Sequence, residues 1–290
     1  MKKRKKFLLC PNPERDIQLE LTKKVYRMLQ EMGEEAVICP VMGVYRNAEL
    51  EASGMGISDI HTELENTKMI ITFGGDGTIL HVARMAAACG IPILGINKGT
   101  LGFMAELEKH DLELIRSAVS GKYRLDKRMM LDVIVQRDGK DIYSDFALND
   151  VVIGGIARII HLTIQGDGRT ITEFSGDGLV VATPTGSTAY SMSAGGPIVE
   201  PDAENILVTP ICAHALIAKS FVLAPDRCVT VTMGPLRGKR AYVATDGGAS
   251  VSLESGDMIR IVKSKCMTKL VSVTERSFYE RVSEKLGERR

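Results

Sequence analysis

Asp76 lies between two glycines in the segment ITFGGDGTIL (71–80), where an apolar run ends. A strand that runs into a glycine-rich turn at the start of a helix commonly binds phosphate, because backbone N–H groups and the helix dipole face the anion. We expect four residues to form this phosphate loop: Gly74, Gly75, Gly77 and Thr78. It is neither a Walker loop nor a standard dinucleotide fingerprint, because GxxxxGK[ST] is absent and Leu80 replaces the last small residue.

The carboxylate of Asp76 needs an explanation of its own, because phosphate oxygens repel it at low effective dielectric unless a cation or a proton-transfer role offsets the repulsion. In kinases, Mg²⁺ screens the phosphates and an aspartate accepts the proton of the attacking hydroxyl. Asp76 is therefore a candidate catalytic base. A side-chain cap of the following helix is an equally good interpretation of the triplet alone.

A second polar segment, DGLVVATPTGSTAYSMSAGGP (177–197), combines small hydroxylated side chains with a tyrosine. The hydroxyl side chains are Thr183, Thr185, Ser187 and Thr188. Their density at a junction between a strand and a helix suits a ligand with many hydroxyl groups. A capped helix without a ligand is the alternative.

A third polar feature is the adjacent pair Asn149 and Asp150 in the strand-like segment ALNDVVIGG. Amides and carboxylates are disfavoured in strands unless they face a partner. Neighbouring strand residues point to opposite faces, so a site that uses both side chains needs a bulge or a strand end. A strand end or turn with no binding role is the alternative.

The elements that position these residues change in type along the chain. Through roughly residue 120, strand-like runs alternate with helical patterns, which predicts a mainly parallel sheet with helices on both faces. The strand-like runs are 6–10, 35–39, 67–73 and 91–97, and the helical patterns are 15–32 and 78–90. The apolar face of the first helix comprises Ile17, Leu21, Val25, Met28 and Leu29. Ligands bind at the carboxyl ends of such strands, where 74–77 and 97–102 fall.

The later part of the chain shows alternating apolar residues, which predicts antiparallel strands. Hairpin turns are expected at Asp138-Gly139 and at Asp167-Gly168. Further strand-like runs, separated by short turns, are 229–233, 241–245, 258–264 and 268–274. We predict an α/β domain over 1–125, a β-rich domain over 126–265, and a tail and helix over 266–290 that pack on the first domain. Residues 42–60 have the composition of a loop.

Composition excludes several classes of partner. Across 290 residues, Lys+Arg 37 nearly balances Asp+Glu 36, so no global charge attracts nucleic acid or an anionic membrane. No apolar stretch approaches the ~18 residues of a membrane span. The apolar part after MKKRKK, Phe7 to Cys10, is shorter than the roughly 7–15 residues of a signal peptide. The six cysteines form no CxxC, which favours buried, reduced thiols in a cytoplasmic protein over disulfides or a zinc site.

Taken together, the polar segments resemble the NAD kinase family. The similar segments are GGDGT (74–78), GINKGTLGF (95–103), LND (148–150), 177–197, TPICAH (209–214), ATDGG (244–248) and SFYERVSEKLG (277–287). They occur in the family's order and approximate spacing, from Lys6 onward. A GDG triplet alone also fits phosphofructokinases and the diacylglycerol and sphingosine kinases, whereas TPTGSTAY is typical of NAD kinases.

The resemblance implies a fold and a reaction. The implied fold is an N-terminal α/β domain followed by a β-rich, NAD-binding domain, assembled as a homodimer or homotetramer. The implied reaction transfers phosphate from ATP, or from polyphosphate in some members, to the 2′-hydroxyl of the adenosine ribose of NAD, giving NADP. A divalent metal ion, Mg²⁺, is expected to arrive with the nucleotide rather than to occupy a protein metal site.

The resemblance also implies individual roles, with Asp76 as the proton acceptor. The implied NAD-binding residues are Asp76, Gly77, His81, Asn149, Asp150, Asp177, Thr188, Ala189, Tyr190 and Ser193. Among them, Asn149 and Asp150 match the pair that holds the adenosine half, and Asp177 matches the aspartate at the nicotinamide end. His81 is otherwise a surface histidine. Asp150 is shorter by one methylene than the Glu of some members, and Gly248 removes the Gln side chain of many.

Two alternatives remain open at this point. The first is another kinase with this loop, acting on a sugar phosphate or a lipid; the motif segments show neither the arginine cluster nor the apolar entrance expected of these. The second is a sensor that binds NAD or NADP without catalysis. Asp76 argues against the sensor, because a pure binding protein gains nothing from a carboxylate beside phosphates. The motifs fit ATP and polyphosphate, and NAD and NADH, equally well.

Overall fold

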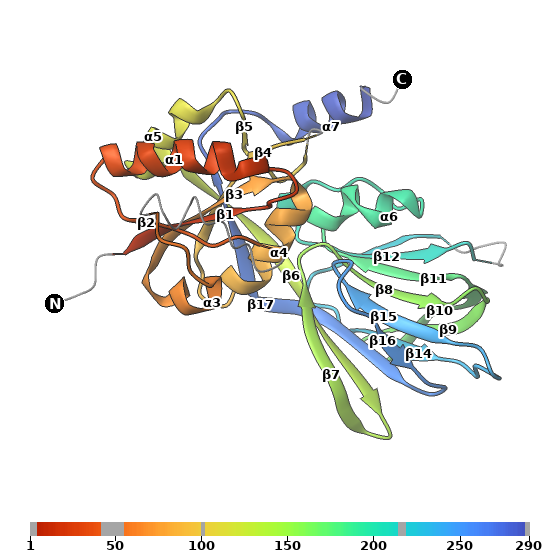
Figure 1. The fold of residues 1–290 in the computed structure, drawn as a ribbon. Coiled ribbons are helices and arrows are strands. Elements are labelled where there is room, and N and C mark those ends of the chain that lie inside the picture. Colours follow the sequence, from red (N-terminus) through yellow and green to blue (C-terminus); the bar gives the residue numbers. More distant parts are fainter. Residues whose placement is uncertain (1–4, 42–54, 100–101, 214–218, 288–290) are drawn as a thin grey trace. The chain divides into compact units, whose positions relative to one another are not determined.

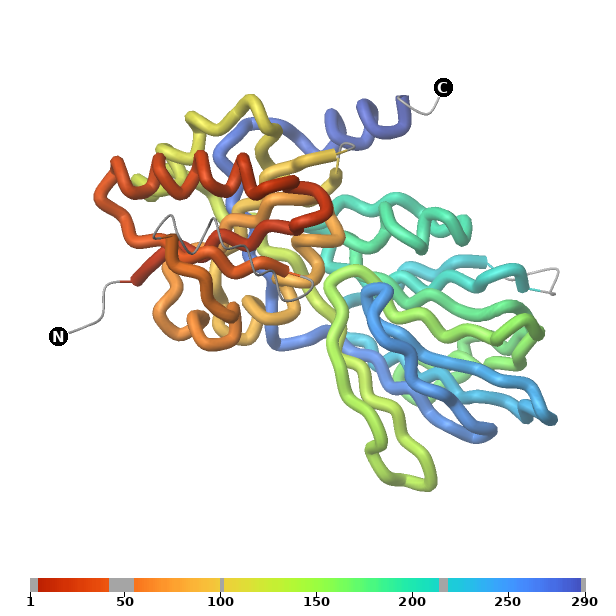
Figure 2. The backbone as a smooth tube through the Cα atoms, viewed as in Figure 1, coloured from red at the N-terminus to blue at the C-terminus, as the bar shows by residue number. Residues whose placement is uncertain are grey.

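The computed structural model describes residues 5–41, 55–99, 102–213 and 219–287 (Figure 1). The chain forms two compact units: unit 1 comprises Met1–Lys127 and Thr268–Arg290, and unit 2 comprises Arg128–Met267. The chain passes into unit 2 within β6 (Arg124–Arg137) and returns within β17 (Met258–Ser272), a path that the tube in Figure 2 follows. Most of the loop expected at 42–60 lies outside the described residues.

Unit 1 contains a parallel sheet with strand order β2-β1-β3-β4. Its strands are β1 (Lys6–Pro11), β2 (Ala36–Ile38), β3 (Thr67–Gly74), β4 (Pro92–Asn97) and β5 (Leu107–Glu108). β4 also pairs in parallel with β5 and with Lys269 and Leu270 of β17. The predicted α/β class with a mainly parallel sheet is therefore confirmed.

Helices cover both faces of this sheet. Phe7, Leu9 and Ile71 share a buried cluster with Val25 and Leu29 of α1 (Glu20–Glu31), because alternate strand residues face the same side. α5 (Ile115–Val119) contributes to the same cluster, and Figure 1 shows it beside α1. On the opposite face, α4 (Asp76–Ala86) packs on β4. The other helices among the described residues of the unit are α3 (Ile60–Glu63), the one-turn segments Ile17–Leu19, Leu64–Asn66 and Leu112–Leu114, and α7 (Phe278–Gly287).

The first helix starts later than its apolar pattern predicts. It begins at Glu20, because the two preceding residues have left-handed φ angles of 54° and 55°. The buried carboxylate of Asp16 accepts the backbone N–H of Thr22 at 2.9 Å, which satisfies one of the free donors at the start of the helix. Ile17, expected on the apolar face, is 67% exposed, and Leu19 is buried in its place.

Unit 2 is a β-sandwich. One antiparallel sheet has the order β13-β12-β11-β8-β15-β16, and the other contains β10-β9-β14-β17. Ile153 and Leu179 of the first sheet share a single buried cluster with Leu162 and Val231 of the second. The strands are β7 (Lys140–Ala147), β8 (Asp150–Gly155), β9 (Ile160–Gly166), β10 (Arg169–Gly176), β11 (Gly178–Ala182), β12 (Ile206–Ile211), β13 (Phe221–Leu223), β14 (Val229–Met233), β15 (Ala241–Thr245) and β16 (Val251–Leu253).

The two predicted hairpin turns are confirmed. Asp138 and Gly139 have φ angles of 51° and 74°, and Asp167 and Gly168 have 50° and 76°, which is the left-handed pair that two-residue hairpins require. The prediction of a turn between 258–264 and 268–274 is wrong, because the single strand β17 (Met258–Ser272) continues from the first run into the second. Residues 264–269 contain neither glycine nor proline, so nothing in their composition ends the strand.

All six cysteines are free thiols. Cys10 and Cys39 are buried, and burial raises the pKa of the Cys10 thiol well above its usual value and that of Cys39 to about 12. The expectation of burial is wrong for Cys89, Cys212 and Cys266, which are exposed. Among the described residues, no helix has the length and apolar character needed to cross a membrane.

Candidate active site

Asp76 is the first residue of α4, directly after the glycine turn that ends β3. Gly75 occupies the N-cap position, and no side chain caps this helix end. The carboxylate of Asp76 instead bonds to a different segment: Oδ2 accepts the N–H of Phe103 at 2.8 Å, and Oδ1 accepts the N–H of Met104 at 3.0 Å. The interpretation of Asp76 as a side-chain cap is therefore wrong.

Glycine is required where this carboxylate meets the neighbouring segment. A Cβ at Gly102 would overlap Oδ1 of Asp76 and would lie 3.0 Å from its Cγ. A Cβ at Gly74 would overlap the side chain of Thr78, which is buried. By contrast, a Cβ at Gly75 or Gly77 would meet nothing within 4 Å, so the backbone there is open to a ligand.

His81 lies on the exposed side of α4, between Asp76 and the helix end. Partial desolvation lowers the pKa of its imidazole, and the charges of Arg84 and His61 lower it further. The neutral ring is therefore favoured at neutral pH, and His81 can donate one hydrogen bond rather than offer a fixed positive charge.

Charged and polar residues to which the motifs alone gave no role lie near the carboxyl ends of β1 and β4. Lys98, just after β4, forms an ion pair with the buried Asp16 at 2.9 Å. Asn97 is buried and donates its amide to Glu108 at 3.0 Å, while its Oδ1 has no partner among the described residues. The position of Asn97 and Lys98 at the end of the buried strand β4 was the available signal in the sequence.

In unit 2, Asn149 and Asp150 lie at the start of β8, which confirms a strand end at this pair. Asp246, which follows β15 with a φ of 50°, accepts the backbone N–H groups of Leu148, Asn149 and Asp150 at 2.8, 2.7 and 3.2 Å. Asp246 therefore fixes the backbone that presents the pair. This aspartate lies in the ATDGG segment, and the motif alone assigns it no role.

Asp150 is 5% exposed and has an unusual acidity. The pKa of its carboxyl is raised to about 7, mainly by burial and further by the charge of Asp246, against a hydrogen bond from the backbone of Tyr190 that lowers it. The pKa of the Tyr190 phenol is raised by desolvation and then by neighbours that include Tyr242, Asp150 and Asp177. The structure therefore brings two of the predicted residues, Asp150 and Asp177, within electrostatic range of a third, Tyr190.

The buried hydroxyls of the 183–188 segment hold the fold rather than face outward. Thr183 donates to the carbonyl of Leu148 at 2.6 Å and accepts the N–H of Gly186 at 3.1 Å. Ser187 donates to the carbonyl of Val199 at 3.1 Å. The interpretation of these two hydroxyls as ligand contacts is wrong, because both side chains are fully buried.

The remaining predicted residues of this segment lie at or just after the end of the one-turn helix Thr185–Thr188. Thr188 and Ala189 are half-buried, and Tyr190 and Ser193, at the two ends of α6 (Tyr190–Ser193), are exposed. These residues can reach a ligand. The one-turn segment Pro201–Ala203 follows before β12.

Asn149 contributes an unsatisfied acceptor. Its side chain is buried, and its Oδ1 has no hydrogen-bond partner in the part of the chain that the structure describes. A buried polar atom without a partner costs on the order of 1–3 kcal/mol. Such an atom is a candidate acceptor for a hydrogen-bond donor of a ligand.

The chain thus combines a parallel α/β unit that has an open glycine turn with a β-sandwich unit that has a cluster of polar loops. Residues 7–123 match the family model described as the ATP-NAD kinase N-terminal domain, and residues 148–273 match the ATP-NAD kinase C-terminal domain. The chain is 37% identical to the NAD kinase of Acetivibrio thermocellus over 98% of both chains. It is 40% identical to that of Natranaerobius thermophilus over 96% of both chains.

Solved structures agree with this relationship. The yeast NADH kinase complexed with NADH is similar with a TM-score of 0.84 and 25% identity, covering 99% of this chain and 89% of that one. An NAD kinase from Archaeoglobus fulgidus in complex with ATP has a TM-score of 0.73 and 25% identity, covering 97% and 98%. The chain therefore belongs to the NAD kinase family and is a phosphotransferase, as the resemblance of its motifs predicted.

We expect Gly102→Ala to lower turnover by about 10- to 100-fold, because a new Cβ displaces the Asp76 carboxylate and small misplacements of reacting groups slow catalysis by this order. Gly56→Ala is the matched control, since a Cβ there meets nothing within 4 Å. Steady-state assays of both variants check this expectation. A Gly102→Ala protein with the wild-type kcat would show that the fit of residue 102 against Asp76 is irrelevant to turnover.

The acidity of Asp150 predicts a pH-dependent stability. Its pKa is about 7 in the folded chain and 3.8 for an ordinary aspartate, so between these values the folded state keeps a proton that the unfolded state has released. Stability is therefore greatest below about pH 4, and the free energy of unfolding falls as pH rises towards about 7, by at most about 1.4 kcal/mol per pH unit, after which the loss is complete.

Asp150→Asn should remove this component. Relative to wild type, the free energy of unfolding of the variant in urea should therefore rise by about 1 kcal/mol or more between about pH 5 and about pH 8. Asp202→Asn, an exposed substitution in the same unit, is the control and should follow the wild-type curve. Parallel curves for Asp150→Asn and wild type would refute the raised pKa.

Proposed function

We propose that the chain transfers the terminal phosphoryl group of ATP to the 2′-hydroxyl of the adenosine ribose of NAD, giving NADP, and that Asp76 accepts the hydroxyl proton. The observation that supports this most directly is the anchored Asp76 carboxylate beside the open backbone of Gly75 and Gly77. Solved relatives in complex with NADH and with ATP support the choice of substrates.

The anchoring of Asp76 is compatible with proton acceptance. A carboxylate offers about four lone-pair sites, and the N–H groups of Phe103 and Met104 use two of them. The remaining sites can accept the hydrogen bond of a ribose hydroxyl and then its proton. An aspartate is a weak base toward an alcohol, so the chain contributes mainly by orienting this hydroxyl in line with the phosphoryl group.

Residues of unit 2 account for binding of the dinucleotide in this proposal. The unpaired Oδ1 of Asn149 and the carboxyl of Asp150 bind the adenosine half, and Asp177 binds the nicotinamide end. Thr188, Ala189, Tyr190 and Ser193 enclose the dinucleotide, and Gly77 and His81 of unit 1 contact it. Gly74, Gly75, Gly77 and Thr78 form the phosphate loop.

A divalent cation belongs to this reaction, and Mg²⁺ is the proposed ion. Among the described residues, no group of three or more His, Cys, Asp or Glu side chains is placed to hold a metal. In this proposal the ion binds with the phosphates of ATP and neutralises their charge. Polyphosphate is the alternative phosphoryl donor.

We further propose that the protein is cytoplasmic, in keeping with its six free thiols. We also propose that it forms a homodimer or homotetramer.

The direct test is an assay with NAD and Mg²⁺ and either ATP or polyphosphate, in which a coupled NADP-specific dehydrogenase detects the product. We expect NADP to form with ATP. Tight NAD binding without NADP from either donor would favour the sensor, and phosphorylation of sugar phosphates or lipids in place of NAD would favour the other kinases.

In the same assay, Asp76→Asn should lower kcat by about 10²- to 10⁴-fold, the usual contribution of a general base. The affinity for NAD should change by less than about threefold, because binding depends mainly on other residues. Glu113→Gln, which alters an exposed carboxylate of the same unit, is the control. A near-wild-type kcat for Asp76→Asn would remove this residue from the chemistry.

A further inference from the structure

The C-terminal helix α7 contacts the same segment that holds Asp76. Nη1 of Arg281 donates to the carbonyls of Phe103 and Ala105 at 3.4 and 3.2 Å, and Nη2 donates to Oε2 of Glu106 at 2.6 Å. Lys285, one turn later, places its ammonium 4.0 Å from the centre of the Phe103 ring. All of these residues belong to unit 1.

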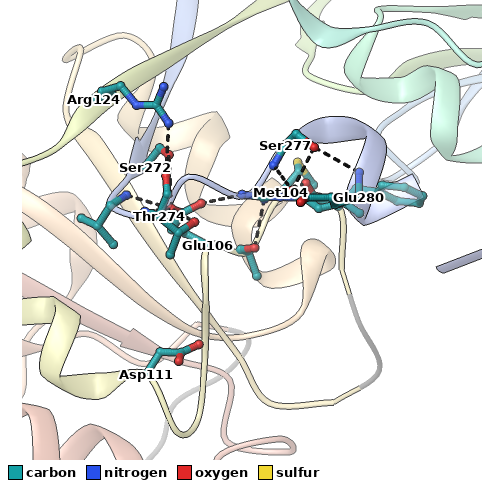
Figure 3. Close-up of polar contacts among 12 residues, drawn as sticks. Met104, Glu106, Asp111, Arg124, Ser272, Thr274, Ser277 and Glu280 are labelled. Atoms are coloured by element: carbon teal, nitrogen blue, oxygen red, sulfur yellow. Dashed lines mark hydrogen bonds and ion pairs between the residues drawn. The ribbon is translucent and has the colours of Figure 1, made fainter. Parts of the chain in front are cut away.

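Glu106 is the fixed end of this arrangement. Its side chain is 4% exposed, and its Oε1 accepts the N–H groups of Val273 and Thr274 at 2.8 and 2.7 Å and the Thr274 hydroxyl at 2.7 Å. Figure 3 shows Glu106 close to Thr274, with Ser277 at the start of α7 nearby. The Glu106 N–H also donates to the carbonyl of Gly95 in β4 at 3.0 Å. Glu106 is thus tied to the sheet and to the connection between β17 and α7.

A single peptide plane joins Arg281 to Asp76. The carbonyl of Phe103 and the N–H of Met104 belong to the same planar amide. Arg281 bonds to the carbonyl end of this amide, and Asp76 Oδ1 bonds to its N–H end. A cation at the carbonyl also polarises the amide, which strengthens the N–H as a donor. Rotation of this plane would break both hydrogen bonds together.

We propose that Arg281 and Glu106 are positioning residues for phosphoryl transfer, which hold the 103–106 segment so that its N–H groups orient the Asp76 carboxylate. This inference rests on the proposed role of Asp76 as proton acceptor. Arg281 is 12% exposed and Glu106 is 4% exposed, so the pair is shielded from water, and loss of one partner leaves the other charge buried and unpaired. Neither residue touches the reacting atoms in this account.

The test compares variants of Arg281 with a matched control on the same segment of chain. Arg276 forms a partly exposed ion pair with Glu284 of α7 and, within the described part of the chain, makes no hydrogen bond to 103–106. We expect Arg281→Gln to lower kcat by about tenfold or more with the KM for NAD changed less than about threefold. Arg276→Gln should keep the wild-type kcat and KM. A wild-type kcat for Arg281→Gln would overturn the proposal.

A double variant separates positioning from a general structural role. If Arg281 acts through Asp76, Arg281→Gln should lower the residual rate of Asp76→Asn by less than about twofold, because coupled residues are not additive. An equal fold-loss in both backgrounds would overturn the proposal. If Asp76→Asn itself keeps the wild-type rate, the proposed function fails first, so the two failures are distinguishable.

Arg281→Lys covers the case in which Arg281→Gln fails to fold. Lysine keeps the charge next to Glu106 but lacks the planar fork that bonds the carbonyls of Phe103 and Ala105 together with Glu106. We expect a folded protein, by circular dichroism and thermal unfolding, with kcat lowered by about three- to tenfold. The same loss should disappear in the Asp76→Asn background. A folded Arg281→Lys protein with the wild-type kcat would overturn the proposal.

Discussion

The candidate site of unit 1 depends on one interaction: the carboxylate of Asp76 bound to the N–H groups of Phe103 and Met104. The parallel sheet makes this contact possible, because β3 and β4 end at the same edge and the chain continues from each into the loops that meet there. A glycine at 102 is the steric condition for it. The carboxylate is thereby oriented before any substrate arrives, and orientation is the main contribution that phosphoryl transfer requires of a protein.

In unit 1 backbone N–H groups position a carboxylate, whereas in unit 2 a carboxylate positions the backbone. The carboxylate of Asp246 accepts the N–H groups of 148–150 and so fixes this segment. The carboxyl of Asp150 is buried and lies near the charge of Asp246. Burial and this charge together raise the pKa of Asp150 to about 7. Hydroxyl or amino donors of a bound nucleotide would favour the ionised form of Asp150, so substrate binding would relieve part of this cost.

Local sequence patterns predicted the helices, strands and motifs, but they did not predict the long-range contacts that orient the side chains. The βαβ alternation, the glycine turn around Asp76 and the hairpin at Asp167 follow from periodicity and turn residues. The hydrogen bonds to Asp76 join residues 27 and 28 positions apart. The bond that Asp246 accepts from Asn149 spans 97 positions, and the bond that Arg281 donates to Glu106 spans 175. No sequence periodicity records such pairs. The start of α1 was misplaced for a related reason, because a buried Asp16 outweighs the apolar pattern.

The most direct test of the central claim is a crystal structure of the chain with NAD and a non-hydrolysable ATP analogue, in which the distance from the Asp76 carboxylate to the ribose 2′-oxygen is measured. The account predicts about 2.6–3.2 Å, the range of a catalytic hydrogen bond, with the bonds from Phe103 and Met104 intact. A carboxylate turned away from the adenosine ribose, with the 2′-hydroxyl beyond hydrogen-bonding reach, would contradict the assignment of Asp76 as proton acceptor.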